Sequence, residues 1–234
     1  MKTCKAGRVL KQAVAIIVLV CAGGSLFGCS SLLPKPVAAP TLYALETLRV
    51  PAATLASGAT ALAASSKLAT LVVNTPRADA GFDSQHIMYV REQYKLEYFA
   101  HSEWVDTPAR MLAPLMVLTI ANGGVFKAVV PASIAATGEL TLDTEIVRLQ
   151  QDFSAQPSRV VFTLRAYLVD TQTRKTIAWR ELETVVASTS DDPVGGVVAT
   201  NRAVQIALQQ IADFCAEAEK EWQAARSAAP PIAR

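Results

Sequence analysis

Few residues of this 234-residue chain have the types and spacing that catalysis or metal binding requires. Its only two histidines, His86 and His101, stand in no ligand spacing typical of a metal site. Neither a G-x-S-x-G motif nor a phosphate-binding glycine loop is present. The pair Asp191-Asp192 precedes an expected helix, whose dipole favours negative charge there, and Cys215 falls on an apolar helical stripe. The sequence therefore predicts no catalytic residue, no metal site and no bound cofactor.

The residue best placed for chemistry is Cys29, which ends the stretch Leu26-Phe27-Gly28-Cys29. This stretch resembles the lipobox of bacterial lipoproteins, and it follows a basic head and an apolar run, the order of a secretory signal peptide. A cysteine thiolate can accept a diacylglyceryl group as a thioether, and cleavage between Gly28 and Cys29 would free the amine for further acylation. We expect residues 1–28 to be the signal peptide and Cys29 the lipidated residue. The alternative, that Cys29 is merely a small apolar residue, stays open.

Lipidation would keep the mature chain on a membrane, because two or three acyl chains hold a protein almost permanently. Ser30 stands where an inner-membrane retention signal would place aspartate, so resemblance to enterobacterial sorting predicts the outer membrane, with the body facing the periplasm. Residues 29–40 contain three prolines and are expected to form an extended tether. Beyond residue 28 the chain has 18 basic and 20 acidic residues, which gives no reason to expect a nucleic-acid partner.

Hydrophobic periodicity predicts a single α+β domain over residues 41–223, followed by a disordered tail at 224–234. The helices are expected from Thr107-Pro108 to Asn122, and from Asp192-Pro193 onward. Strands are expected at 41–48, 67–73, 85–91, 95–101, 139–150, 159–170 and 176–188. This order favours a largely antiparallel β-sheet with two main helices packed on one face.

One strand shows how the sheet should be oriented. Its apolar residues Leu140, Leu142 and Ile146 share one face. Asp143, Glu145 and Gln151 are expected on the other face. We therefore expect one side of the sheet to face water.

Aromatic residues gather in a short segment that is expected to form a hairpin. Amphipathic aromatic side chains can line a lipid groove or a protein interface. We select Tyr94, Tyr98 and Trp104 as candidate contacts for a partner or a lipid. The alternative, that the cluster forms the core and rim of the hairpin, stays open.

The order of several segments resembles the ABC-type transport auxiliary lipoprotein component family. They are the lipobox, "TLYALE", "LVVNTPRADAGFDSQHIMYVREQYKLEYFAHSEWVDTPARMLAPLM" and "LDTEIVRLQQDFSAQPSRVVFTLRAYLVDTQTRKTIAWRELE". The resemblance covers about residues 29–222 and implies a lipoprotein that accompanies an ABC permease and ATPase carrying MCE-domain proteins. Of the functional positions, only Cys29 transfers by this resemblance.

Two functions compete at this point. The first is a non-enzymatic outer-membrane subunit of a lipid or hydrophobic-compound transport system, docking the periplasmic MCE assembly. The second is a general envelope-assembly lipoprotein with another periplasmic partner. A lipid-handling hydrolase is disfavoured because no catalytic motif is present. Assembly into a ring of identical copies, and binding of a lipid ligand, stay open.

Overall fold

The computed structural model describes residues 39–46, 68–134 and 137–228. The chain divides into two units, 1–39 and 40–234, and every described helix and strand belongs to the second. The predictions for the signal peptide, for Cys29 and for most of the tether concern residues outside the described ranges. Within those ranges, no helix combines the length and the apolar character needed to cross a bilayer.

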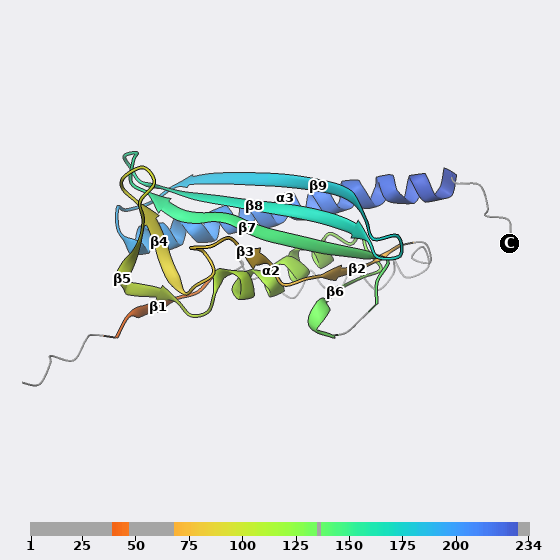
Figure 1. Cartoon of the computed structure of the whole chain (residues 1–234), viewed down its shortest axis with the longest axis horizontal. Helices are drawn as coiled ribbons and strands as arrows, with labels where there is room; N and C mark the ends of the chain where they lie inside the picture. The colour runs from red at the N-terminus through yellow and green to blue at the C-terminus, as the bar shows by residue number, and fades with distance from the viewer. Residues whose placement is uncertain (1–38, 47–67, 135–136, 229–234) are drawn as a thin grey trace, which may run out of the picture. The chain divides into compact units, whose positions relative to one another are not determined.

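The nine-stranded sheet is organised around β7 (Leu140–Asp152). On one edge of β7 lie β8 (Arg159–Asp170) and then β9 (Lys175–Ala187), both paired antiparallel. These three long strands cross the front of the domain in Figure 1, with the C-terminal helix behind them. The connecting turns are short, because consecutive antiparallel strands need only a hairpin.

The other edge of β7 receives three short strands in succession, each running parallel to it. They are β2 (Thr70–Val73), β3 (Arg77–Ala78) and β4 (His86–Val90). Two arms extend the sheet beyond these strands: β6 (Ala128–Pro131) pairs with β2, while β5 (Leu96–Trp104) pairs with β4 and carries β1 (Thr41–Tyr43).

The α+β class is confirmed, but the prediction of a largely antiparallel sheet is wrong, because the sheet is mixed. Five strand pairs are parallel: β1 with β5, β2 with β6, and β7 with β2, β3 and β4. Parallel neighbours come from segments far apart along the chain, so no local turn announces them. The strands β3 and β6, of two and four residues, are too short for an alternating pattern and were not predicted.

Two helices cover the buried face of the sheet. The long helix α3 (Pro193–Ala228) packs on β8 and β9, and α2 (Pro108–Asn122) packs on α3, β6 and β2. Met116 of α2 also contacts Thr144 on the buried face of β7, with 3.9 Å between Sδ and Oγ1. Helix α3 continues five residues past the predicted boundary at 223, so residues 224–228 are helical and not a disordered tail. Residues 229–234 lie outside the described ranges.

A β-bulge in β7 corrects the predicted orientation of one residue. Leu140, Leu142 and Ile146 are fully buried, as predicted, but the register shifts between Ile146 and Arg148. The inserted residue reverses the alternation, because side chains in a strand change face with every residue. Gln151 therefore points into the domain, only 2% exposed, instead of joining Asp143 on the outer face.

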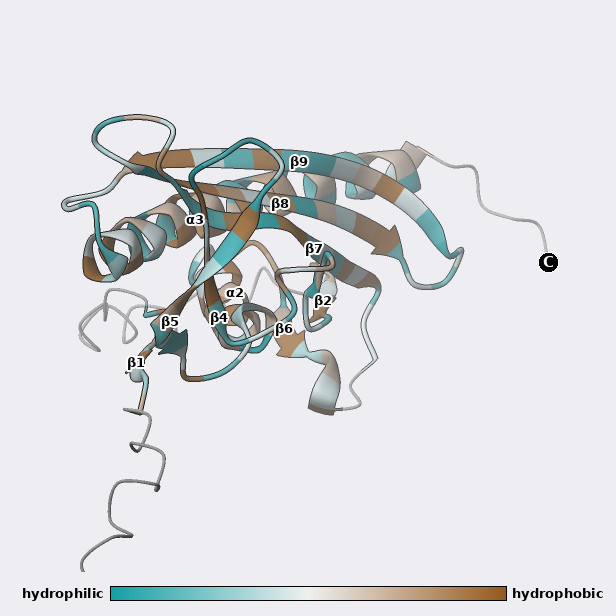
Figure 2. Cartoon of the chain, turned by 60° about the vertical axis from the view of Figure 1, so that its left-hand side comes forward, coloured by the Kyte–Doolittle hydropathy of each residue, from teal (hydrophilic) through white to brown (hydrophobic). Residues whose placement is uncertain are grey.

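The outer face of the three long strands is solvated and carries paired charges. Figure 2 shows hydrophobic and hydrophilic bands alternating along β8 and β9. In the middle of this face the Arg165 guanidinium binds Glu181 at 2.7 Å and Glu145 at 2.9 Å. Beside it, the rings of Tyr167 and Trp179 stack across the strands, with their centroids 6.4 Å apart. The prediction of one water-facing side is thus confirmed.

Candidate functional site

The hairpin of β4 and β5 carries the most exposed aromatic residue of the described chain. Its turn, residues 91–95, forms the loop at the upper left of Figure 1. At this turn Tyr94 is 95% exposed and adopts a φ of 68°, a left-handed conformation that non-glycine residues seldom adopt. A large amphipathic ring held at the tip of a hairpin is well placed to contact another molecule.

The three aromatic candidates from the sequence do not lie together on the surface. Tyr98 is half-exposed, and its ring stacks on His86 with the centroids 4.2 Å apart. Trp104, at the end of β5, is only 2% exposed and belongs to the hydrophobic core. Its side chain cannot reach a partner in this fold, so the candidate contact surface narrows to Tyr94 and Tyr98.

The hairpin is stiffened beside its turn by three aromatic rings. Tyr89 and Phe99 pack with their centroids 4.5 Å apart, and Phe153, from the β7–β8 connection, meets both rings edge-on. The Arg91 guanidinium lies 4.9 Å above the centre of the Tyr89 ring. Such contacts restrain the orientation of the hairpin relative to β7. Thus the alternative from the sequence, in which the aromatics form the core and rim of the hairpin, describes most of the cluster.

A cleft of about 690 Å³ separates the hairpin turn from the end of β7. Its wall is apolar at Phe82 and Leu96 and charged elsewhere, with basic and acidic residues both present: Arg91, Lys95, Arg148, Glu92 and Asp152. Gly81, with a φ of 99°, turns the chain so that Phe82 enters this wall; a Cβ at Gly81 would lie 2.9 Å from Leu96. The cleft thus combines apolar surface with charged groups of both signs, a combination suited to an amphipathic ligand or a protein side chain.

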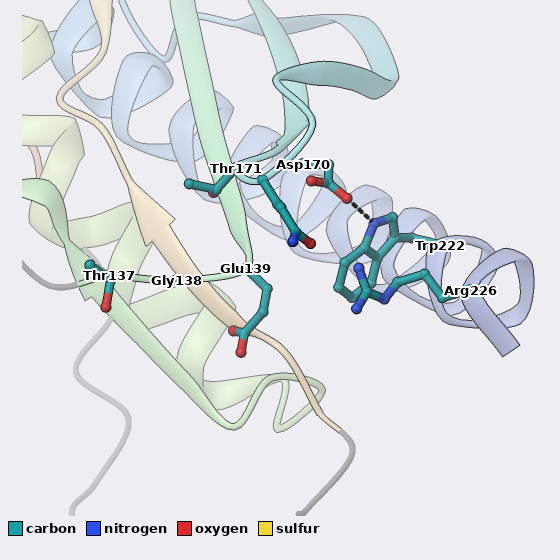
Figure 3. A pocket seen from close by; sticks show the side chains of 8 residues that line it. Thr137, Gly138, Glu139, Asp170, Thr171, Trp222 and Arg226 are labelled. Carbon is teal, nitrogen blue, oxygen red and sulfur yellow. Dashed lines mark hydrogen bonds between the residues drawn. The ribbon is translucent and has the colours of Figure 1, made fainter. Parts of the chain in front are cut away.

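A second hollow, of about 330 Å³, lies where α3 ends against the β8–β9 turn. Figure 3 shows its central contact, the hydrogen bond that Trp222 Nε1 donates to Asp170 Oδ2 over 2.9 Å. The Arg226 guanidinium stacks on the Trp222 ring, and Glu139 accepts a hydrogen bond from the Thr70 amide. Backbone donation from Thr173, then the Trp222 bond, hold the pKa of Asp170 below its ordinary value. Because these polar groups already have partners, we interpret the contacts around this hollow as structural: they hold the end of α3 against the β8–β9 turn.

The described residues offer binding surfaces more readily than reactive groups. No cluster of three or more histidine, cysteine or acidic residues that could hold a metal occurs in the described ranges. Cys215 is buried in the core, and this burial raises the pKa of its thiol to about 12, which opposes formation of a nucleophilic thiolate. Recognition through the hairpin surface is therefore the activity that the geometry supports best.

The fold recurs in solved structures of low sequence identity. Protein XCC0632 from Xanthomonas campestris is 19% identical, with a TM-score of 0.60, over 65% of this chain and 87% of that one. A crystallised uncharacterised protein is 12% identical, with a TM-score of 0.58, over 76% of this chain and 99% of that one. At these identities the likeness establishes the fold alone. No curated protein matches the sequence.

The class of protein defined by this fold is a mixed-sheet α+β domain with two helices on one face. The sequence profile of one family, the ABC-type transport auxiliary lipoprotein components, matches residues 53–212. The chain belongs to this family, which confirms the resemblance inferred from its motifs. Members of this family are lipoproteins with an auxiliary role in ABC-type transport. The function of this chain is to be sought within that role.

Proposed function

We propose that this protein is a non-enzymatic, outer-membrane-anchored subunit of an MCE/ABC-type system that transports lipid or another hydrophobic compound. The acylated Cys29 would hold the domain on the periplasmic side of the outer membrane through the tether at residues 29–40. The domain would dock the periplasmic MCE assembly, which is served in turn by an ABC permease and ATPase. Membership of the auxiliary lipoprotein family supports this role.

The observation that carries the docking proposal is the exposed hairpin turn. Tyr94 is 95% exposed in a left-handed conformation, and it borders the cleft formed with Leu96 and Arg148. A monomer gains nothing from exposing an aromatic ring in an unfavourable backbone conformation, whereas aromatic residues beside arginine are typical anchors of protein interfaces. We assign the partner contact to Tyr94 and Tyr98, with the cleft as the place where an amphipathic lipid would bind.

The test is affinity purification of the full-length lipidated protein from its own membranes in mild detergent, with proteins and lipids identified by mass spectrometry. The intact mass reports acylation of Cys29. We expect an MCE-domain protein to be recovered with its permease and ATPase. A Tyr94→Ser, Tyr98→Ser variant should lose most of this recovery while keeping the acylated mass.

A matched control is Trp179→Ser, which removes an exposed aromatic ring from the outer face of β9, far along the sheet from the hairpin turn. Recovery of the partners should be unchanged in this variant. Equal losses from both variants would contradict a specific role of the hairpin. Recovery of an unrelated periplasmic partner by the acylated wild type would favour the general envelope-assembly function instead.

A further inference from the structure

Helix α2 leaves an apolar face without a partner in the described chain. Its inward residues Leu112, Met116 and Ile120 are buried in the core. Its outward side is also apolar where it is exposed: Leu118 is 47% exposed and Pro114 is exposed, whereas Met111 and Leu115 are partly buried and pack against the core. Residues 114 and 118, four apart, follow the spacing that puts side chains on one helix face. A surface helix normally carries charge on its outward side.

Helix α3 provides the comparison within the same domain. Its solvent side has exposed valines in the first two turns, Val194 and Val198, but farther along it is charged, with Arg202, Asp213, Glu217 and Lys220 all unburied. Helix α2 carries a single charged residue, Arg110, in its first turn. Arg110 is exposed one turn before Pro114, so the outward side of α2 carries one cation and no other charge. A side that is otherwise apolar indicates a surface that is covered when the protein is in place.

The start of the domain lies next to this helix. The Val105 amide donates to the Tyr43 carbonyl over 2.8 Å, and α2 begins three residues later at Pro108. From Thr41 back to Cys29 the chain has twelve residues, which can span at most about 40 Å when fully extended. An acylated Cys29 would therefore keep the membrane within reach of the end of the domain that carries α2.

We propose that the outward face of α2 rests on the lipid bilayer that holds Cys29, with Pro114 and Leu118 as its principal contacts. This inference depends on the lipid anchor of the proposed function. Ile134, on the 3₁₀ turn after β6, is 65% exposed and extends the apolar surface, because α2 packs on β6. An apolar helix face lying in the headgroup region needs no partner protein, only proximity to the membrane.

The arrangement of the domain suits this orientation. In Figures 1 and 2 the hairpin turn between β4 and β5 lies on the opposite side of the domain from η3 (Ala132–Ile134), with α2 on the η3 side. With α2 on the bilayer, the turn that contains Tyr94 lies on the far side of the domain from the membrane. The contact therefore orients the docking surface toward the periplasm, which a tether alone cannot do.

The experiment uses full-length acylated protein in vesicles of phosphatidylethanolamine and phosphatidylglycerol. Leu118→Cys is labelled with an environment-sensitive fluorophore, and quenching by lipids spin-labelled near the top of the acyl chain is measured. Trp179→Cys, on the outer face of β9 and 63% exposed, is the matched control. The buried Cys215 thiol, with its pKa raised to about 12, should not label in the folded protein. We expect at least threefold stronger quenching at position 118 than at position 179.

Vesicle flotation separates the two proposals. Protein that does not float would refute the lipid anchor. Protein that floats but shows equal quenching at both positions would overturn the contact of α2 with lipid. Shielding of position 118 only after the transport partners are added would also overturn the contact with lipid. It would show that a partner protein covers the outward face of α2. If Leu118→Cys does not fold by circular dichroism, the same quenching measurement at Ile134→Cys distinguishes these outcomes.

Discussion

The packing of α3 against the end of β7 makes one substitution unusually informative, Gly196→Ala. Glycine inside a helix ordinarily costs about 0.5–1 kcal/mol relative to alanine, so this change should stabilise an isolated helix. In this domain, a Cβ on Gly196 would lie 2.2 Å from Oε1 and 2.8 Å from Cδ of Gln151. The buried Gln151 is the residue that the β-bulge turns inward. We therefore expect the substitution to destabilise the protein.

The magnitude follows from what the clash disturbs. Ordinary van der Waals contact begins at 3.4 Å, so the amide must retreat by about 1 Å. Overpacking of this kind costs about 1–3 kcal/mol. The amide also donates to Ser158 Oγ over 2.9 Å, and loss of that buried hydrogen bond adds about 1–3 kcal/mol. After the gain in helix propensity, the net loss in free energy of unfolding is about 3 kcal/mol, within about 1 to 5.

Urea unfolding followed by circular dichroism measures this loss directly. The decisive comparison is a double-mutant cycle with Gln151→Ala, which removes the atoms that the new methyl group would strike. In that background Gly196→Ala should cost at least about 1.5 kcal/mol less than in the wild type. Arg202→Ala, at an exposed position on the same helix, should change stability by no more than about 0.5 kcal/mol. Equal costs of Gly196→Ala in both backgrounds would refute the packing argument.

Three further predictions concern buried groups. Burial raises the pKa of Glu219 above its ordinary value, so the protonated side chain stabilises the fold at low pH, and this contribution is lost as the pH rises through the folded-state pKa. At neutral pH the Glu219→Gln variant should therefore be more stable than the wild type. A stability difference between the two proteins that does not change with pH would contradict this. Trp222→Phe removes a hydrogen-bond donor from the Asp170 carboxylate and should lower the free energy of unfolding by about 1.5–3 kcal/mol at neutral pH. The loss should be smaller at low pH, where the carboxylate is protonated, and urea unfolding at several pH values measures it. Cys215 should react with a thiol reagent only after unfolding, because it is fully buried and burial raises its thiol pKa to about 12; rapid reaction of the native protein would show otherwise.

The long elements of this fold are readable from sequence because their patterns are local. The strand predicted at 159–170 has the same bounds as β8, and the helix predicted to end at Asn122 does end there. The short strands β3 and β6 exist only because β7 and β2 offer them edges, so they have no pattern of their own. The bulge after Ile146 also has no recognisable pattern in the sequence. It places Gln151 on the opposite face of β7 from the one that the alternation of residues predicts.

The candidate site could be predicted only as a segment. Clustering of aromatic residues located the hairpin, but the sequence could not separate the exposed Tyr94 from the buried Trp104. That difference depends on tertiary neighbours: β1 pairs with the end of β5, with Tyr43 opposite Trp104, while the turn at Tyr94 projects beyond the sheet. The outward face of α2 was missed for a related reason, because a helix apolar nearly all round is usually buried.

The parallel strand pairs of β7 determine when the sheet can form during synthesis of the chain. Three strands that pair with β7 are synthesised before it: β2, β3 and β4. Leu71, for example, pairs with Leu140, which lies 69 positions later in the chain. These apolar segments must therefore stay unpaired with β7 until that strand has been synthesised. Because such distant pairings form slowly, the interval before β7 emerges is when the chain is most prone to aggregation.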